Sequence, residues 1–374
     1  MEEYELSDDE IKEMLSEFSN FGDLKLCDEK FSGGFGHLRK VFSKKYNKYY
    51  TIKIIPLKEG DESRKEPIKE FRGKNIIKIN QEKLYNNKYY IYLMEYSAMG
   101  DLQKFIKYYY LSIKNKYESY NPFLEDIGDN LMRYFILQIF VAMRTFYLGN
   151  LVHYDIKPNN FLLFNGLVLK IIDFSLLKKL DDGGGIPGGT PGYRTPESYI
   201  DDDGDEKPKK FTYDVLRKQD YFAIGATIFY IKYNKPMLDY DKNISDTDYD
   251  RTIISDIIIE SLFKAKNFIK LQKYQNKDFT KFLLSLISYN PDDRPDFETI
   301  IRNKWLNQNY KEIEKTSIVF NMDEDELILE LQKSDFLIKK RDYSRNNNEE
   351  NIKNKNNYIY NKKSKFKFRK IKNI

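Results

Sequence analysis

The stretch 151–175, LVHYDIKPNNFLLFNGLVLKIIDFS, constrains the fold of this chain more than any other. It holds four polar residues whose spacing matters: Asp155, Lys157, Asn160 and Asp173. The apolar run 167–172 follows Asn165-Gly166, which predicts a buried strand after a tight turn. We therefore expect two carboxylates, a lysine and an amide on short connections at one end of a small sheet. Phosphoryl transfer needs such a set, because it uses a base, a cation near the moving phosphate and oxygen ligands for Mg2+.

Length and composition narrow the class of protein. The 374 residues are enough for one large or two ordinary domains, and a hydrophobic content of 41% fits a globular chain. Cys27 is the only cysteine, which excludes an internal disulfide framework and suits a reducing compartment. We expect no N-terminal signal, because residues 1–20 are acidic and interrupted, and no transmembrane segment, because continuous apolar runs are short. We therefore expect a soluble cytoplasmic protein, with the nucleus as the alternative location.

The net charge of +5 is unevenly spread along the chain. Residues 346–374 hold nine Lys or Arg against two Glu, so they carry +7 and the remaining residues carry −2. The basic segment 362–372, KKSKFKFRKIK, interleaves apolar side chains with cations. Such a segment suits an anionic membrane surface, a nucleic acid or an import receptor, and a merely solubilising tail is an equal alternative.

A glycine cluster lies between two strand-like runs in residues 24–57. Glycines at 33, 34 and 36 would let backbone N–H groups approach phosphate oxygens without a Cβ in the way, although a simple hairpin turn fits too. Lys53 follows inside the apolar strand 49–55. A lysine in such a strand needs a charged partner, and the phosphates of ATP would supply one.

At these motifs the chain resembles the eukaryotic protein kinase family. HYDIKPNN at 153–160 resembles the catalytic loop, and Asp173-Phe174-Ser175 resembles the metal-binding triplet. The glycine cluster resembles the glycine-rich loop, with Phe31 in place of the first glycine. Residues 189–197 resemble the end of the activation segment, with Thr195 in place of the usual alanine. Small-molecule kinases lack that segment, so it favours a protein kinase.

The resemblance implies an α+β, bilobal fold with a small β-rich N-lobe and a larger, mainly helical C-lobe. The motifs follow the family order over 24–310, with the N-lobe at about 24–96 and the C-lobe at about 97–310. Outside the range of the resemblance, we expect residues 1–23 to form an acidic helical extension. We expect residues 311–374 to form a C-terminal tail that is basic and disordered from about residue 346.

The family pattern also implies roles for single residues. Asp155 would accept or orient the proton of the substrate hydroxyl, and Lys157 would neutralise charge at the γ-phosphate of ATP. Thr190 beside Lys157 resembles the serine/threonine-specific pattern. Asn160 and Asp173 would hold Mg2+. Two structural contacts are expected as well: a brace from Asp220 to the catalytic loop and an ion pair between Glu197 and Arg294.

The nucleotide site implied by the resemblance draws on both lobes. The residues expected to bind ATP are Gly33, Gly36, Leu38, Lys53, Glu66, Glu95, Ser97, Asp101 and Leu162. Backbone groups of the linker 95–101 would bond adenine. Glu66 is chosen as the partner of Lys53, but Glu62 and Glu70 share its helical spacing, Glu70 is a close rival and Pro67 interrupts the segment.

Other stretches predict structure without chemistry. Ser7 to Glu10 form a capping box ahead of apolar residues at helical spacing, so we expect a short amphipathic helix that packs on the adjacent lobe, with partner docking as the alternative. Residues 108–129 predict a solvated insertion, 131–148 a core helix and 201–210 a disordered loop.

Two functions compete at this point. The first is an active, ATP-dependent serine/threonine protein kinase acting on protein substrates. The second is a catalytically impaired pseudokinase that serves as a nucleotide-binding scaffold, favoured by Phe31, Ser175, Thr195 and the uncertain glutamate. We favour the first, because every charged group that the chemistry requires is present.

Overall fold

The computed structural model describes the residues 6–31, 36–57, 73–116, 129–180, 188–198, 212–238, 251–272 and 275–307. Several parts of the chain with predictions lie outside these ranges. They are residues 1–5, Gly33 and Gly34, Glu66 with its two rivals, residues 117–128 of the predicted insertion, the loop 201–210 and the tail 311–374 with its basic segment 362–372.

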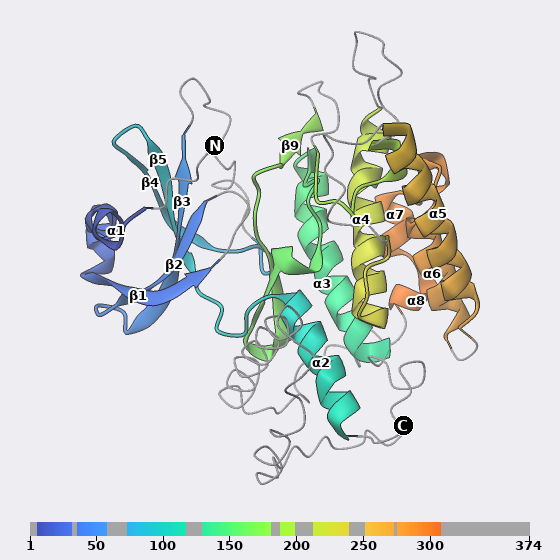
Figure 1. Cartoon of the computed structure of the whole chain (residues 1–374), viewed down its shortest axis with the longest axis horizontal. Helices are drawn as coiled ribbons and strands as arrows, with labels where there is room; N and C mark the ends of the chain where they lie inside the picture. The colour runs from blue at the N-terminus through green and yellow to red at the C-terminus, as the bar shows by residue number, and fades with distance from the viewer. Residues whose placement is uncertain are drawn as a thin grey trace, which may run out of the picture. The chain divides into compact units, whose positions relative to one another are not determined.

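A five-stranded antiparallel sheet forms the N-terminal part, in the order β1-β2-β3-β5-β4 (Figure 1). The strands are β1 Leu24–Phe31, β2 His37–Ser43, β3 Lys48–Pro56, β4 Ile79–Tyr85 and β5 Tyr89–Glu95. The central strand β3 is rich in tyrosine and isoleucine, which favour strands. Its alternate side chains point to opposite faces, with Ile52 and Ile54 on one face and Thr51 and Lys53 on the other.

The helix α1, Asp8–Leu15, covers the isoleucine face of this sheet (Figure 1). It begins at the predicted capping box, in which the backbone N–H of Ser7 donates to Glu10 Oε2 at 2.8 Å and the Glu10 N–H donates to Ser7 Oγ at 3.3 Å. The apolar residues of α1 and of the following 3-10 turn share one core with the sheet: Ile11, Met14, Leu15, Phe18, Val41, Tyr50, Ile52, Ile54, Ile91 and Leu93. The predicted helix and its packing on the adjacent lobe are confirmed.

A buried arginine fixes the orientation of α1. Arg39, on β2, is only 4% exposed, and its guanidinium lies 2.5 Å from Asp8 Oδ1 and donates to the carbonyl of Cys27 at 3.0 Å. Because Asp8 opens the helix, its carboxylate also lies where the helix dipole favours negative charge.

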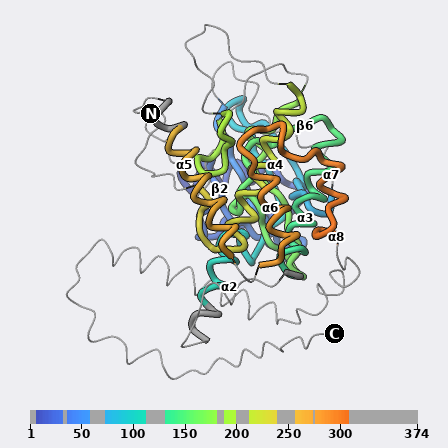
Figure 2. Tube along the Cα trace, turned by 90° about the vertical axis from the view of Figure 1, so that its right-hand side faces the viewer, coloured from blue at the N-terminus to red at the C-terminus, as the bar shows by residue number. Residues whose placement is uncertain are grey.

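Helices make up most of the C-terminal part (Figure 2). They are α2 Leu102–Lys116, α3 Asp129–Leu148, α4 Tyr213–Tyr233, α5 Arg251–Lys270, α6 Lys277–Leu286, α7 Phe297–Ile301 and α8 Lys304–Asn307. The helix α4 is buried along most of its length and contacts α3 and α6. Trp305 in α8 is fully buried against Phe279 and Phe282.

Two short antiparallel strand pairs carry the motif-rich stretch. β7, Phe161–Phe164, pairs with β8, Val168–Ile171, across a turn in which Gly166 has φ +71°. β6, Leu151–Val152, pairs with β9, Lys178–Lys179. The strand predicted after the Asn165-Gly166 turn is therefore confirmed.

The segment 75–77 ties the sheet to the helical part. The Ile77 N–H donates to the carbonyl of Ile171, and the Ile171 N–H donates to the carbonyl of Asn75, both at 3.0 Å. The buried Asn75 amide also donates to Gln138 Oε1 on α3 at 2.9 Å. The two parts thus share backbone pairing as well as side-chain contacts.

The prediction of a solvated insertion at 108–129 is wrong for its first part, because α2 continues to Lys116. Tyr110 is buried, and its hydroxyl donates to the carbonyl of Lys232 in α4. The tyrosines there made the segment look polar, whereas a tyrosine ring can be buried when its hydroxyl finds an acceptor.

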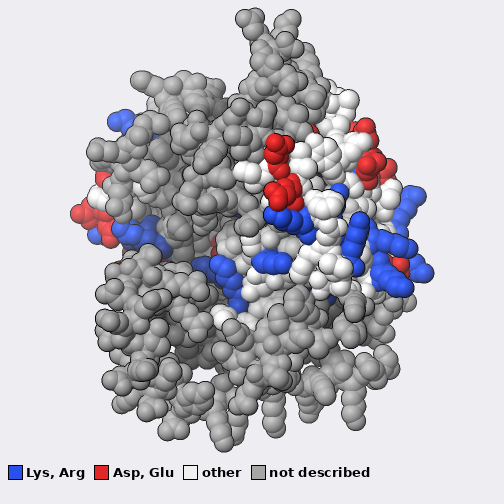
Figure 3. Space-filling model, turned by 45° about the vertical axis from the view of Figure 1, so that its right-hand side comes forward, with Lys and Arg blue, Asp and Glu red and all other residues white. Residues whose placement is uncertain are grey.

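The helix at 131–148 is confirmed as part of α3. Among the described residues it is the one helix long and apolar enough to span a membrane by length and composition, and 61% of that stretch is buried inside the protein. A core helix has the same properties. On the face shown in Figure 3, Lys and Arg side chains of the described residues lie beside Asp and Glu side chains at several places.

We predict that Ile11→Ala destabilises the protein by about 2–5 kcal/mol, because it removes a side chain that is 1% exposed and leaves a cavity between α1 and the sheet. Thermal and urea unfolding would measure the loss. Lys12→Ala, on the exposed side of the same helix, is the matched control and should leave the midpoint nearly unchanged. Equal midpoints for the two variants would show that α1 is not part of the core.

Candidate active site

One buried carboxylate, that of Asp220 in α4, holds the start of the loop 153–160 in place. Asp220 accepts the backbone N–H of His153 and of Tyr154, each at 2.8 Å, which confirms the predicted brace. Burial raises the pKa of Asp220 to about 7, although the two N–H groups act to lower it. Tyr154 has φ +65°, a region that non-glycine residues rarely adopt, and the bond to Asp220 helps to hold it there.

The ring of His153 is part of the core behind this loop. It lies 5.7 Å from the rings of Phe146 and Phe174. Burial lowers the pKa of His153 to about 4, so the imidazole is neutral at pH 7. Phe174 is itself buried between these rings, which fixes the start of the segment after β8.

Three predicted residues, Lys157, Thr190 and Asn160, come together around Asp155. Lys157 Nζ lies 2.8 Å from Asp155 Oδ2 and 2.6 Å from the hydroxyl of Thr190. That hydroxyl donates to Asp155 Oδ1 at 2.5 Å, and the Thr190 N–H donates to the same oxygen at 3.2 Å. The amide of Asn160 donates to Asp155 Oδ2 at 2.8 Å. The carboxylate therefore accepts from a lysine, a hydroxyl, an amide and a backbone N–H.

Asp155 is ionised at neutral pH. Burial alone would raise its pKa, but the charge and hydrogen bond of Lys157 and the hydroxyl of Thr190 outweigh burial and hold the pKa below its usual value. An ionised carboxylate that contacts an aliphatic hydroxyl can accept or orient that hydroxyl's proton.

The second acid, Asp173, pairs with the lysine of the sheet. Asp173 Oδ1 lies 3.1 Å from Lys53 Nζ, and the Lys53 side chain is only 7% exposed. Burial raises the pKa of Asp173, but the charge and hydrogen bond of Lys53 outweigh it and the net shift is downward. The next residue but one, Ser175, has no positive φ, so this position does not need the freedom of glycine.

A backbone hydrogen bond links the segments that carry Asn160 and Asp173, the two residues expected to hold Mg2+. The Ile172 N–H, just before Asp173, donates to the carbonyl of Asn160 at 2.9 Å. The described residues contain no group of three His, Cys, Asp or Glu side chains placed to hold a metal. One carboxylate and one amide oxygen fit Mg2+, which is commonly bound through one or two carboxylates together with waters and substrate phosphates.

The register of the sheet places further predicted residues on the face of Lys53. Leu38 lies directly opposite both Phe31 and Lys53, so the three side chains share that face. Gly36 has φ +147°, and a Cβ there would lie 2.4 Å from the carbonyl oxygen of Ile54. Glycine is therefore required at 36 by the approach of β2 to β3, and its contact with phosphate stays a prediction.

The remaining predicted residues lie at the end of β5, in the linker that follows it and, for Leu162, on β7. The Glu95 carboxylate lies 2.6 Å from Lys170 Nζ on β8. The hydroxyl of Ser97 donates to the carbonyl of Leu163 on β7. Asp101 forms a β-bridge with Leu162 and accepts the Lys104 N–H at 2.8 Å, which caps α2. These contacts attach the linker to the β7–β8 hairpin, and its contacts with a base stay predictions.

The segment 188–198 lies beside the loop of Asp155. Gly189 has φ +125°, and a Cβ there would lie 2.8 Å from the carbonyl oxygen of Tyr154, so only glycine permits this approach. The end of the segment is fixed by Glu197 and Arg294, whose paired contacts at 2.6 and 2.7 Å confirm the predicted ion pair. Arg294 is 1% exposed, so removing Glu197 would leave a buried charge unpaired.

Comparison with known proteins agrees with this arrangement. A family model described as the protein kinase domain matches residues 32–306, most of the chain. This chain belongs to the protein kinase family. Its α+β, bilobal fold, with a β-rich N-lobe and a helical C-lobe, is the fold of that family.

Curated relatives of this kinase domain are distant. Human serine/threonine-protein kinase tousled-like 1 is 24% identical over 302 residues, which cover 73% of this chain and 35% of the relative. Tousled-like 1-B of Danio rerio is 25% identical, covering 79% of this chain and 40% of the relative. The probable serine/threonine-protein kinase nek1 of Dictyostelium discoideum is 24% identical, covering 74% and 55%. The chain thus spans two-fifths or less of the two tousled-like relatives.

Two features of this kinase domain were missed by sequence reasoning. Lys40 Nζ lies 4.3 Å from the ring centre of Tyr49 and 4.9 Å from that of Tyr96, and its other partner is Glu29. The strand alternation that places Lys40 on the face of Lys53 would have indicated this cluster. Gln219, next to Asp220, binds Glu197 at the end of the activation segment. The sequence signal that could have indicated this contact is the polar side chain of Gln219 in an otherwise apolar helix.

Proposed function

We propose that this chain is an active serine/threonine protein kinase that transfers the γ-phosphate of ATP to serine or threonine hydroxyls of proteins. One observation carries the proposal: the Thr190 hydroxyl donates to the ionised Asp155 at 2.5 Å, while Lys157 Nζ contacts both groups. An aliphatic hydroxyl on a base, with a cation beside it, is the arrangement that the reacting hydroxyl of a substrate requires.

The residues of the chain divide the work of phosphoryl transfer. Asp155 takes or orients the proton of the substrate hydroxyl while the new O–P bond forms and the bond from the γ-phosphorus to the oxygen of ADP breaks. Lys157 neutralises charge at the transferred γ-phosphate. Lys53, whose ammonium group contacts Asp173, holds the α- and β-phosphates of ATP. Asn160 and Asp173 would hold Mg2+, which supplies charge neutralisation at the phosphates.

A pseudokinase scaffold is the second candidate, because Phe31 replaces the first glycine of the phosphate-binding loop. The other departures argue less for it. Ser175 adopts a backbone that any residue accepts, and the hydroxyl of Thr195 has a hydrogen-bond partner. The names of the relatives, all serine/threonine kinases, support the choice of hydroxyl substrate. The cytoplasmic location and the contacts of the basic segment 362–372 stay predictions.

Asp155→Asn should lower turnover by roughly 10²- to 10⁴-fold, because the amide cannot take up the proton, while ATP affinity stays close to that of the wild type. Phosphate transfer to a generic basic protein measures turnover, and thermal shift with ATP measures binding. Asp256→Asn, at an exposed position of α5, is the matched control and should leave both unchanged. Near-wild-type turnover in Asp155→Asn would refute the role of Asp155.

Asp173→Asn should abolish the tightening of nucleotide binding by Mg2+, since it removes the one carboxylate of the proposed metal pair. The measurement is the thermal stabilisation by ATP with and without Mg2+, which reports affinity through ligand linkage. The same Mg2+-dependent stabilisation in the variant and the wild type would refute the assignment and favour a scaffold that holds nucleotide without metal.

We further predict activity without phosphorylation of the activation segment. Many family members have an arginine before the catalytic aspartate, which pairs with a phosphate on that segment, and here the position is Tyr154. Its ring packs against Val152, Leu180 and Leu216. Between Ser175 and Thr190 the sequence has no Ser, Thr or Tyr. Neither the arginine that would bind a phosphate nor the hydroxyl residue that would carry it is therefore in the usual place.

The test is to express residues 1–374 in bacteria, strip phosphate with a phosphatase, remove the phosphatase and assay transfer. Activity should persist at the level of the untreated protein. An activity that is lost and then returns on incubation with ATP, together with a phosphate mapped between Asp173 and Glu197, would refute the prediction.

A further inference from the structure

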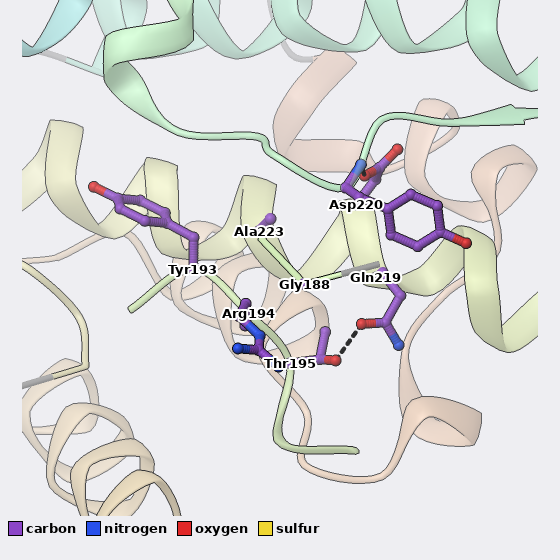
Figure 4. A pocket seen from close by; sticks show the side chains of 8 residues that line it. Gly188, Tyr193, Arg194, Thr195, Gln219, Asp220 and Ala223 are labelled. Carbon is purple, nitrogen blue, oxygen red and sulfur yellow. Dashed lines mark hydrogen bonds between the residues drawn. The ribbon is translucent and has the colours of Figure 1, made fainter. Parts of the chain in front are cut away.

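A buried hydrogen-bonded pair replaces the alanine that the family has at position 195. Thr195 is 1% exposed and Gln219 is 5% exposed. The hydroxyl of Thr195 donates to Gln219 Oε1, as drawn in Figure 4, and Gln219 Nε2 donates to Glu197 Oε1 at 2.7 Å. Glu197 is in turn bound by Arg294. Four side chains from three separate parts of the sequence thus form one chain of hydrogen bonds.

The direction of these hydrogen bonds is fixed by chemistry. The Glu197 carboxylate, paired with Arg294, can only accept, so the NH2 group of Gln219 has to face it. The carbonyl of Gln219 then faces Thr195, whose hydroxyl is the group that donates to it. A residue without a hydroxyl at 195 would leave that buried carbonyl without this donor, which is costly.

The position of Gln219 links two functional segments. Gln219 and Asp220 are consecutive in α4, and Asp220 holds the N–H groups of His153 and Tyr154 just before the base. One turn of α4 therefore holds the catalytic loop through one side chain and the end of the activation segment through the next. Thr195 and Gln219 also line a small pocket between these segments, with the residues shown in Figure 4.

We propose that Gln219 is a positioning residue for the protein substrate. Through Thr195 and Glu197 it sets the place of the segment 188–198 relative to Asp155, and so the width of the site in which a substrate hydroxyl reaches the base. The proposal rests on the proposed kinase function. It differs from the Glu197–Arg294 pair, because Arg294 also donates to the carbonyls of Ser288 and Tyr289 and holds Glu197 without Gln219.

The test compares Thr195→Val, which keeps the shape and removes the hydroxyl, with Thr195→Ser, which keeps the hydroxyl. Thr195→Val should raise the KM for the protein substrate roughly tenfold, while the KM for ATP stays within about twofold of the wild type. Thr195→Ser should have the same KM for the protein substrate as the wild type. A protein-substrate KM that is the same in Thr195→Val and Thr195→Ser would overturn the proposal.

A second measurement does not depend on catalysis. The N–H groups of Tyr193 and Ser198 are bonded to the carbonyls of Thr190 and Thr195 at 3.1 Å. In Thr195→Val their hydrogen exchange should become roughly tenfold faster, while the N–H groups of His153 and Tyr154 keep the wild-type rate. Equal acceleration at all four sites would indicate general destabilisation and overturn the positioning role.

The two measurements also separate this inference from the function on which it rests. A wild-type protein that transfers no phosphate to any protein would refute the proposed function, and the exchange rates would still decide whether Gln219 positions the segment. Unchanged exchange at Tyr193 and Ser198 in Thr195→Val would overturn the inference even in an active kinase.

Discussion

The active site depends on one constraint, the buried carboxylate of Asp220. A carboxylate inside an apolar helix bundle is unfavourable unless its oxygens are bonded, and here the backbone N–H groups of His153 and Tyr154 bond both. To present two successive N–H groups to one carboxylate, the loop turns sharply, and Tyr154 takes a positive φ. Asp155 follows directly after this turn. The position of the base is therefore set from α4, beneath the loop.

Each acid of the site has a lysine partner from a different part of the fold. Asp155 pairs with Lys157 in the same loop, whereas Asp173 pairs with Lys53 from the sheet of the N-lobe. In both cases burial acts to raise the pKa of the acid, but the charge and hydrogen bond of the lysine act to lower it more strongly. Both pKa values therefore lie below their usual values. The site therefore holds its charges before any substrate arrives, which is the property expected of electrostatic preorganisation. The second pair also couples the two lobes.

The sequence was informative where chemistry depends on spacing within a short motif. Spacing predicted that Asp155, Lys157 and Asn160 lie together with Asp173, and the family resemblance placed Thr190 beside Lys157. The structure places Lys157, Asn160 and Thr190 in contact with Asp155. The sequence was uninformative where a contact joins distant residues and at least one of them belongs to no motif. Gln219 gains its role from partners more than twenty positions away, and α2 extends because Tyr110 finds an acceptor in α4. Neither partner can be recognised before the fold is known.

Three departures from the family pattern, apart from Phe31 in β1, lie in or next to the activation segment and share a physical character. Tyr154 replaces a cation with a ring that packs on apolar side chains, and Thr195 replaces an alanine with a hydroxyl bonded to a neutral amide. Ser175 replaces a glycine without requiring its freedom. Apolar packing and hydrogen bonds between neutral groups need no added charge to form, in contrast to an arginine that waits for a phosphate. In this chain the described parts of the activation segment, 173–180 and 188–198, are held by contacts that are part of the fold itself.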